Sequence, residues 1–285
     1  MPKKKNSVVI SIRLDDQSLQ AVDLLVESGL ETNRSRAVSH LVTKGIQASE
    51  DLLRKAQVLA DHVYQLRNEM LEAITHNNLE KVTELIHKDS SLVNASNSKG
   101  ETAVLIATYL RANDIKELLI NHGAELNIFE AAAVDNTMRV RNLLEQSPEL
   151  ISAYGPDGFN PLSMASHFGN METVKLLLDL GANVNSRSKD GSLNNMAIHA
   201  AIMGNYEHII QMLIQYGADI HAKCEGSLRL GYTVLHVAAY FGRDSLVKLF
   251  LEHGVDPALT NADGETPYEV AVNKGHLLTA ALLKR

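Results

Sequence analysis

One segment near the N-terminus alternates with the two-residue period of a β-strand. Residues 7–14 place three apolar side chains on one face: Ile10, Ile12 and Leu14. The opposite face holds Val9, Ser11 and Arg13. The backbone groups of a strand need a partner strand, and no second strand of similar quality follows in the sequence. We therefore expect a second copy of the chain to supply the partner, which predicts a homodimer.

Two short helices are predicted directly after this strand. Asp15 and Asp16 are good N-caps for the first helix, whose apolar positions recur at helical spacing until Gly29. Asn33 is placed to cap the second helix, which we expect to end at Gly45. The expected apolar faces are Leu19, Val22, Leu25 and Val26 in the first helix and Ala37, Val38, Leu41 and Val42 in the second. A unit this small holds too little core alone, which again favours a dimer.

The order of strand, helix, turn and helix resembles the ribbon-helix-helix family of bacterial DNA-binding dimers. The resemblance covers residues 8–45, and its most specific parts are the alternating strand and the Asn-Arg-Ser-Arg-Ala opening of the second helix. It implies a DNA-binding and dimerisation domain at residues 7–46, preceded by a flexible basic arm at residues 1–6. It also implies a bacterial, phage or archaeal origin and a cytoplasmic, nucleoid-associated protein.

Two sets of DNA contacts follow from this resemblance. In the family the paired strands lie in the major groove, so the base-contact candidates here are Val9, Ser11 and Arg13. Val9 departs from the polar residue that is usual at its position. The start of the second helix holds a phosphate in the family, which implicates Asn33, Arg34, Ser35 and Arg36. The alternative is that this unit only dimerises the chain.

Residues 47–70 are predicted to form a long helix with apolar residues spaced alternately by four and three, as in a coiled coil. These residues are Leu52, Ala56, Leu59, Val63, Leu66 and Met70. Two interpretations remain open, a parallel two-stranded stalk that continues the dimer and a helix that caps the next domain.

The remaining chain, residues 71–285, repeats with a period of about 33 residues. The clearest units start at Gly158, Gly231 and Gly264, with related tetrapeptides at residues 160–163, 233–236 and 266–269. These segments resemble ankyrin repeats, about seven in number, which implies stacked helix pairs in a solenoid. The expected fold is therefore mainly α, a dimeric ribbon-helix-helix head followed by an ankyrin-repeat solenoid. The unit at 191–230 departs most from the pattern, with extra residues in the loop 222–230.

The repeats imply a binding surface for an unknown protein partner. Side chains just before each mid-repeat turn recur in register, and a stripe of them is a candidate anchor for that partner. The candidates are Tyr109, His167, Phe168, Met203, Tyr240 and Phe241. The alternative is that part of each pair packs between repeats. The loop 222–230 is a second candidate, whereas His199 and His236 are expected to hydrogen-bond between adjacent repeats.

Composition narrows the function classes. The net charge is −7, yet residues 1–48 hold seven Lys or Arg and only five Asp or Glu, so the head is the part suited to DNA. No apolar run has the length of a membrane span, and no apolar segment follows Lys3–Lys5, so we expect neither a membrane protein nor a secretory signal. Cys224 is the single cysteine. We find no catalytic, cofactor or metal motif and expect none, and His208, His221 and Cys224 are too irregularly spaced for a metal site.

The sequence therefore predicts a dimeric DNA-binding transcriptional regulator with a protein-binding ankyrin body, and no enzyme activity. One alternative is an antitoxin-like autoregulator that masks a protein partner. Another is an interaction scaffold or effector whose head only dimerises.

Overall fold

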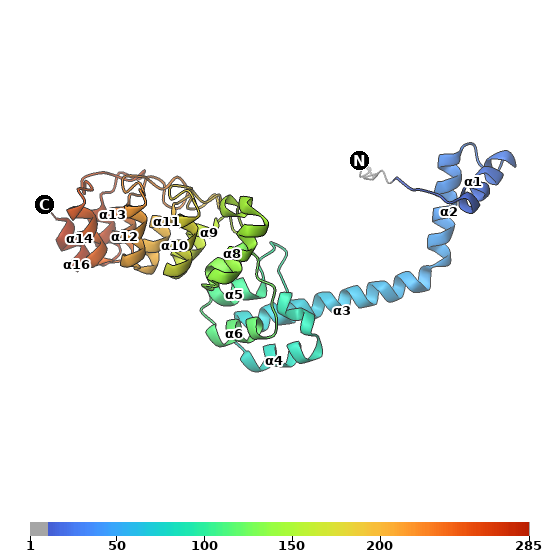
Figure 1. The fold of residues 1–285 in the computed structure, drawn as a ribbon, viewed down its shortest axis with the longest axis horizontal. Helices are drawn as coiled ribbons and strands as arrows, with labels where there is room; N and C mark the ends of the chain where they lie inside the picture. Colours follow the sequence, from blue (N-terminus) through green and yellow to red (C-terminus); the bar gives the residue numbers. More distant parts are fainter. Residues whose placement is uncertain (1–10, 285) are drawn as a thin grey trace. The chain divides into compact units, whose positions relative to one another are not determined.

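The computed structural model describes residues 11–284, and these form two compact units that meet between Gln65 and Leu66 (Figure 1). Among the described residues the regular structure is helical, and the only β-type pairs are single bridges from Ser96 to Thr102 and from Arg187 to Met196. The fold class is thus mainly α, as the sequence predicts.

The first unit contains α1 (Asp16–Glu27), α2 (Arg34–Ala48) and the start of α3 (Glu50–Thr75). The Asp15 carboxylate accepts a hydrogen bond from the Ser18 amide at 2.8 Å, and the Asn33 side chain accepts one from the Arg36 amide at 3.0 Å. Asp15 and Asn33 are therefore confirmed as N-caps, whereas Asp16 is the first residue of α1. The chain leaves α1 through Gly29, whose φ of +76° suits a residue without a Cβ.

The predicted strand is not present in the described part of its segment. Residues 11–14 have no regular structure, and residues 7–10 lie outside the described residues. The physical reason is that a strand requires a neighbour for its backbone groups, and a single chain supplies none here. The described part of this unit therefore has two helices and no strand, and the predicted dimeric ribbon-helix-helix head is not supported.

The predicted helix boundaries in this region were also wrong in detail. The second helix continues through Gly45 to Ala48, since an interior glycine costs a helix only about 1 kcal/mol. The predicted helix at 47–70 instead occupies Glu50–Thr75. Only its last turns bury side chains, those of Met70, Ala73 and Ile74, so this end belongs to the repeat core. The remaining turns are solvent-exposed, and the stalk interpretation stays a prediction for them.

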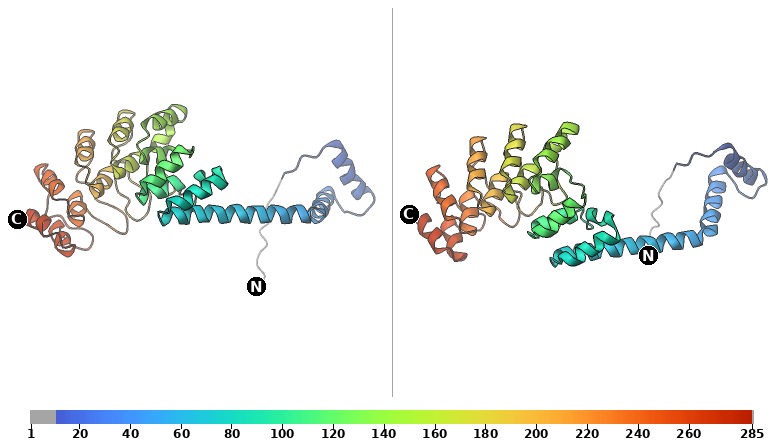
Figure 2. Two further views of the ribbon diagram at one scale, coloured as in Figure 1. Left: turned by 90° about the horizontal axis from the view of Figure 1, so that it is seen from below. Right: turned by 60° about the horizontal axis from the view of Figure 1, so that its bottom comes forward.

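The second unit consists of helix pairs stacked in two rows (Figure 2). The first row contains α5 (Ala103–Tyr109), α7 (Ile128–Ala133), α9 (Pro161–Phe168), α11 (Ala197–Gly204), α13 (Val234–Tyr240) and α15 (Pro267–Asn273). The second row contains α4 (Leu79–Lys88), α6 (Asn113–Asn121), α8 (Thr137–Gln146), α10 (Met171–Asp179), α12 (Glu207–Gln215), α14 (Asp244–Glu252) and α16 (Leu277–Leu283). Two short 3-10 helices, η1 (Ser90–Asn94) and η2 (Pro148–Ser152), follow α4 and α8.

The residues predicted to start and end the repeat helices are confirmed by the backbone. Asn160, Thr233 and Thr266 each begin a first-row helix as the N-cap. Gly181 and Gly217 end second-row segments with φ of +88° and +85°, in the left-handed region that favours glycine. One apolar cluster runs without interruption from Met70 to Leu283, so each helix pair buries its faces against its neighbours.

The predicted histidine links hold for one of two positions. His236 is buried, and its Nε2 lies 2.9 Å from the Glu265 carbonyl oxygen of the next repeat. His199 is equally buried, but its Nε2 has no hydrogen-bond partner among the described residues. Burial lowers the pKa of His199 to about 4, so this side chain is neutral at physiological pH.

Candidate functional site

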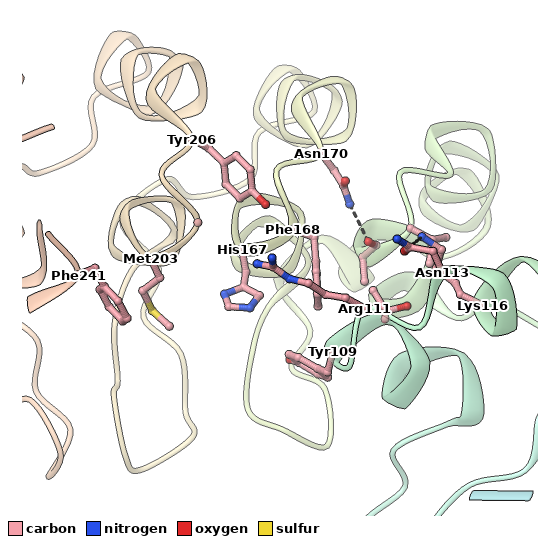
Figure 3. A pocket seen from close by; sticks show the side chains of 14 residues that line it. Tyr109, Arg111, Asn113, Lys116, His167, Phe168, Asn170, Met203, Tyr206 and Phe241 are labelled. Atoms are coloured by element: carbon pink, nitrogen blue, oxygen red, sulfur yellow. Dashed lines mark hydrogen bonds between the residues drawn. The ribbon is translucent and has the colours of Figure 1, made fainter. Parts of the chain in front are cut away.

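A pocket of about 480 Å³ opens at the C-terminal ends of the first-row helices (Figure 3). Five of the six predicted partner-binding residues and Tyr206 line it from different repeats: Tyr109, His167, Phe168, Met203, Phe241 and Tyr206. The structure thus brings together side chains that are separated by more than a hundred residues in the chain. We call this cavity the Tyr109 pocket.

One connection between repeats near the pocket is shorter than the others. Residues 122–127 link α6 to α7, whereas residues 147–160 link α8 to α9 and residues 180–196 link α10 to α11. The longer connections form the projecting turns between repeats, which we call fingers. The third repeat therefore has no finger in front of it, and its Ala133 and Val134 line the pocket with small side chains.

Tyr109 crosses the space that the missing finger leaves. Its hydroxyl donates a hydrogen bond of 2.6 Å to Asp157 Oδ2 in the next finger along the chain. Burial, and then the Asp157 carboxylate, raise the pKa of Tyr109 well above its usual range, so the phenol stays protonated. The fingers on either side are also close, since a methyl group added to Gly100 would lie 3.4 Å from Pro156 Cγ.

The aromatic side chains of the pocket stack against one another. The rings of Tyr109 and Phe168 have centroids 5.2 Å apart, and those of His167 and Phe168 are 4.8 Å apart and perpendicular. Both distances lie in the favourable range for aromatic pairs. Burial, followed by the nearby charge of Arg111, lowers the pKa of His167, which favours its neutral form.

The last two partner-binding candidates, Tyr240 and Phe241, are accompanied by cations. The guanidinium of Arg229 lies 4.6 Å from the Tyr240 ring centroid and 5.0 Å from that of Phe241. Lys274 Nζ lies 4.4 Å from the Tyr240 ring. The positive charges of Lys274 and Arg229 lower the pKa of the Tyr240 phenol. These two rings therefore form a cationic-aromatic patch rather than the purely apolar stripe that the sequence predicts.

The loop 222–230, the second predicted partner-binding candidate, packs against the preceding finger. The Gly226 amide donates to the Leu193 carbonyl at 3.0 Å, and the Leu228 amide donates to Ser192 at 2.9 Å. A Cβ on Gly226 would collide with the Ser192 backbone, so only glycine permits this approach. The loop thus braces a neighbouring finger, while Arg229 at its end faces the aromatic patch.

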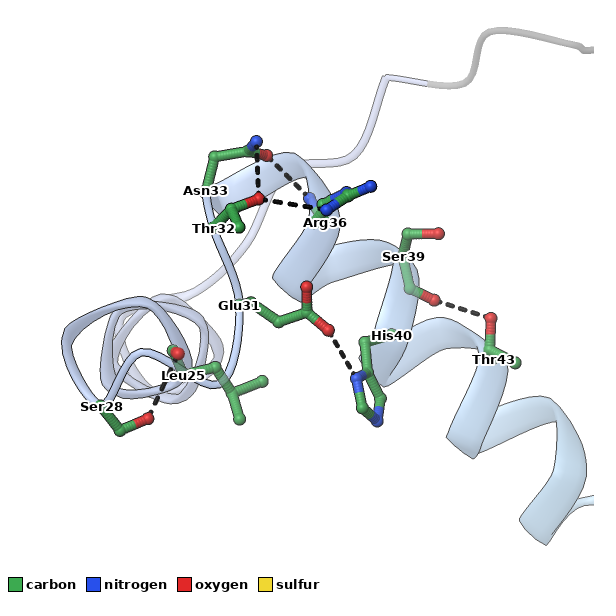
Figure 4. Close-up of polar contacts among 9 residues, drawn as sticks. All are labelled: Leu25, Ser28, Glu31, Thr32, Asn33, Arg36, Ser39, His40 and Thr43. Carbon is green, nitrogen blue, oxygen red and sulfur yellow. Dashed lines mark hydrogen bonds and ion pairs between the residues drawn. The ribbon is translucent and has the colours of Figure 1, made fainter.

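The candidate DNA contacts lie in the first unit, where some of their side chains have no hydrogen bond to another described residue and others already hydrogen-bond to neighbouring residues. Ser11 and Arg13 are exposed, while Val9 lies outside the described residues. The Asn33 side chain is used as the cap of α2, and Arg36 Nη1 approaches Thr32 Oγ1 at 3.5 Å (Figure 4). Ser35 is also exposed in the first turn of α2.

Arg34 has a partner within the same unit. Its Nε and Nη2 atoms donate to the two carboxylate oxygens of Asp23 at 2.6 and 2.8 Å. This bidentate pair raises the pKa of Arg34 and lowers that of Asp23. Arg36 is therefore the better placed of the two arginines for a phosphate at this helix start.

Other chemistry is not supported in the part of the chain that the structure describes. Residues 11–284 contain no group of three or more His, Cys, Asp or Glu that could hold a metal ion. Cys224 is buried, which raises the pKa of its thiol to about 11. Among the same residues no helix combines the length and the apolar character needed to cross a membrane.

Sequence reasoning missed several residues of the Tyr109 pocket, namely Arg111, Asn113, Lys116, Asn170 and Tyr206. Tyr206 is held between Gly169 and Gly204, where any Cβ would overlap its ring. The shortened unit at residues 100–126 was a usable signal for the missing finger. Arg111 and Lys116 gave no such signal in the sequence, because exposed lysine and arginine side chains are common on helices.

Comparison with known proteins agrees with the repeat geometry. Residues 128–224 match a family described as ankyrin repeats in three copies, and residues 227–271 match one described as ankyrin repeats in many copies. The chain carries ankyrin repeats. These matches lie wholly within the second unit, and they identify the stacked helices from α7 to α15 as repeats of this family.

Several curated proteins are similar to the chain over its ankyrin repeats and beyond. A homologue of transient receptor potential cation channel subfamily A member 1 from Caenorhabditis elegans is 26% identical over 76% of this chain and 18% of its own length. The human SH3 and multiple ankyrin repeat domains protein 2 is 27% identical over 84% of this chain and 13% of its own length. The human channel of the first type is 30% identical over 57% of this chain. The chain thus spans less than a fifth of the length of these relatives.

Proposed function

We propose that this chain is a dimeric regulator that binds double-stranded DNA through residues 7–46 and a protein partner through its ankyrin repeats. The protein-binding half is supported by the repeats themselves and by the Tyr109 pocket, in which side chains from five repeats converge. The chain covers less than a fifth of the length of these relatives, so the proposal does not include their activities. The proposal includes no enzymatic activity.

The observation that carries the dimer is the unfinished core of the first unit. In α1 and α2 only Val22 and Ala37 are buried. Large side chains of the predicted apolar faces nevertheless remain exposed, namely Leu19, Leu41 and Val42, and Ile46 is exposed near the end of α2. Burying a leucine of this kind is worth about 1.5–3 kcal/mol, so a surface with this many is stabilised by a partner. A second copy is the occupant we propose, because the alternating sequence of residues 7–14 would pair best with a segment of equal length.

The start of α3 supports the same assignment. Leu52 and Leu59 are 67% and 65% exposed, and Val63 is 40% exposed, at positions of the predicted heptad. Apolar side chains with this spacing pack best against an identical helix. The helices α1 and α2 provide one surface for a second copy of the chain, and the exposed start of α3 provides another.

DNA binding is supported by the chemistry of the exposed polar groups. An arginine on a ribbon in the major groove can donate two hydrogen bonds to guanine, and a helix N-terminus attracts a phosphate. Arg13 and Ser11 are free of side-chain hydrogen bonds to other described residues. The first 48 residues also have a positive balance of charge, unlike the remainder of the chain.

The test is selection of DNA sites from a random duplex library by the purified full chain, followed by affinity measurement on the enriched site. We expect one enriched sequence with two half-sites, and Arg13→Ala to weaken binding by about 1–3 kcal/mol. Arg54→Ala is the matched control, since Arg54 is an exposed arginine on α3 outside the predicted contacts. Binding should also fall steeply with added salt. Dimerisation without sequence preference would instead identify an interaction scaffold.

A further inference from the structure

The Tyr109 pocket has a charge opposite to that of the unit that contains it. Residues 66–285 carry 26 Asp or Glu and only 18 Lys or Arg. The pocket is lined by Arg111 and Lys116, together with neutral residues, and by no carboxylate. Asp157 lies next to it, but its carboxylate accepts the Tyr109 hydroxyl. The pocket is therefore positively charged, although the unit that contains it is acidic as a whole.

A second group of cations lies at the far side of the same surface. Phe241 lines the Tyr109 pocket and also belongs to the cationic-aromatic patch, where Arg243 lies 5.8 Å from its ring centroid. Arg229 and Lys274 complete this patch around Tyr240. The pocket and the patch are thus continuous through Phe241, and we call them together the groove.

The groove cations are not neutralised within the described residues. None of the five forms an ion pair with another described residue: Arg111, Lys116, Arg229, Arg243 and Lys274. Lys116 Nζ donates only to the neutral amide oxygen of Asn113, and Arg243 Nη2 donates to the Met203 carbonyl. Cations that are held by neutral partners remain able to bind anions, and their repulsion is relieved when an anion arrives.

Apolar side chains line part of the Tyr109 pocket between these two groups of cations. Ala133 and Val134 leave a depression bounded by Phe168 and Tyr206, and Met203 continues it toward Phe241. Aromatic rings and a methionine of this kind receive apolar side chains of a partner. The groove therefore combines anion recognition at its ends with an apolar anchor site between them.

We propose that this groove binds an extended peptide segment that is acidic at both ends and carries a large apolar side chain between its acidic residues. One acidic end pairs with Arg111 and Lys116, the other meets Arg229 and Lys274, and the apolar side chain enters the depression at Ala133. This inference rests on the protein-binding half of the proposed function and names the chemistry of the partner. A nucleic acid would supply the anions but not the apolar side chain.

The dimensions set the length of the segment. The groove runs from the second repeat to Lys274 at the end of α15 in the seventh, and neighbouring packed helices lie about 8–10 Å apart. Five such steps span about 40–50 Å, which an extended chain of about 12–15 residues covers at 3.3 Å per residue. A single acidic residue therefore cannot contact both cationic ends at once.

The experiment is selection of displayed random peptides of about twelve residues on the immobilised full chain. Synthetic copies of the enriched peptides are then tested by fluorescence anisotropy. We expect enrichment of Asp or Glu near both ends and of Phe, Tyr, Trp or Leu between them. Replacing the acidic residues of an enriched peptide with Gln or Asn should weaken binding by about tenfold or more.

Two variants of the protein locate the binding. Arg111→Glu combined with Lys116→Glu should weaken binding by about tenfold or more and leave the helical circular dichroism spectrum unchanged. Lys175→Glu is the matched control, because Lys175 is an exposed lysine on α10 and lines neither the Tyr109 pocket nor the patch. Equal binding by both variants would overturn the inference.

The other outcomes are equally decisive. Enriched peptides without acidic residues that still compete for the groove would overturn the inference and leave the protein-binding function in place. Failure to enrich any peptide would overturn the inference, as would displacement of an enriched peptide by a single-stranded oligonucleotide at lower concentration than by the free peptide. The DNA-site selection on the first unit keeps its own separate result.

Discussion

The helices of the two units begin with the same kinds of capping residue, but they bury different amounts of apolar surface. In both, an Asp, Asn or Thr side chain begins the amphipathic helices, as Asp15 and Asn33 do in the first unit and Thr233 does in the second. In the first unit these helices bury little beyond Val22 and Ala37. Local sequence therefore produces the helix, but the neighbouring element decides whether its apolar face is covered.

The repeats gain their stability from neighbours on both sides. Each first-row helix contacts the next, and so the core is continuous along the second unit. The first unit has only two short helices and part of a third, which is below the size at which a single core suffices. Its exposed apolar side chains have no neighbour within the described residues, and our proposal is that a second copy of the chain covers them.

The largest expected effect lies in the repeat core. Phe250 is fully buried on α14, so Phe250→Ala should lower the free energy of unfolding by about 3–5 kcal/mol. Urea denaturation followed by circular dichroism measures it. Leu278→Ala on α16 is the control, since Leu278 is 75% exposed and should change stability by less than about 0.5 kcal/mol. Equal effects would mean that the repeats do not have the continuous core described above.

The next effect addresses the first unit. Leu41 is 39% exposed in one chain, so Leu41→Ala should cost little unless a second copy covers it. We expect a loss of about 2–3 kcal/mol together with a melting temperature that depends on protein concentration. Leu24→Ala is the control, because Leu24 is 65% exposed and outside the predicted apolar face of α1. Small and equal effects of the two substitutions would remove the distinction between the units.

The pH dependence of stability tests the burial of His199 in the second unit. Burial lowers the pKa of His199 to about 4, so the unfolded chain binds the proton more readily than the folded one. The stability from neutral His199 is present above pH about 6.5 and is lost as pH falls toward 4. His199→Gln should therefore reduce the loss of unfolding free energy between pH 7 and pH 5 by about 2 kcal/mol.

Urea denaturation of this variant and of the unmodified protein at the two pH values measures the change. An unchanged acid loss in His199→Gln would show that this histidine is solvated.

The smallest effect concerns the contact that spans the missing finger. Tyr109→Phe removes the hydrogen bond to Asp157 and should lower the free energy of unfolding by about 1 kcal/mol. Tyr64→Phe is the matched control, since Tyr64 is 67% exposed on α3 in the first unit. Differential scanning calorimetry can resolve the two, and identical melting curves for both variants would argue against a structural role for the Tyr109 hydroxyl.

Much of the fold could be predicted because its signals are local. The capping residues Asn160, Thr233 and Thr266 stand immediately before the helices that they begin. The positive φ of Gly181 and Gly217 follows from the absence of a side chain. The buried positions Val82, Leu85 and Ile86 follow from helical spacing.

The remaining features depend on residues that are distant in sequence. Tyr109 and Asp157 are 48 positions apart, and they meet only because the connection at residues 122–127 is short. The cation groups that frame the groove come from different repeats, so no single repeat reveals them. The strand predicted at residues 7–14 would also need a distant partner, and residues 11–14 have no regular structure in the single chain.

The central claim is that the second unit is complete in one chain whereas the first unit is completed by a second copy. Sedimentation equilibrium of the full chain tests this directly, with Leu41→Lys as the comparison. We expect twice the 31.2 kDa mass of one chain for the unmodified protein and the monomer mass for the variant, with the ankyrin repeats still helical in both. A monomer mass for the unmodified protein at every concentration would contradict the account.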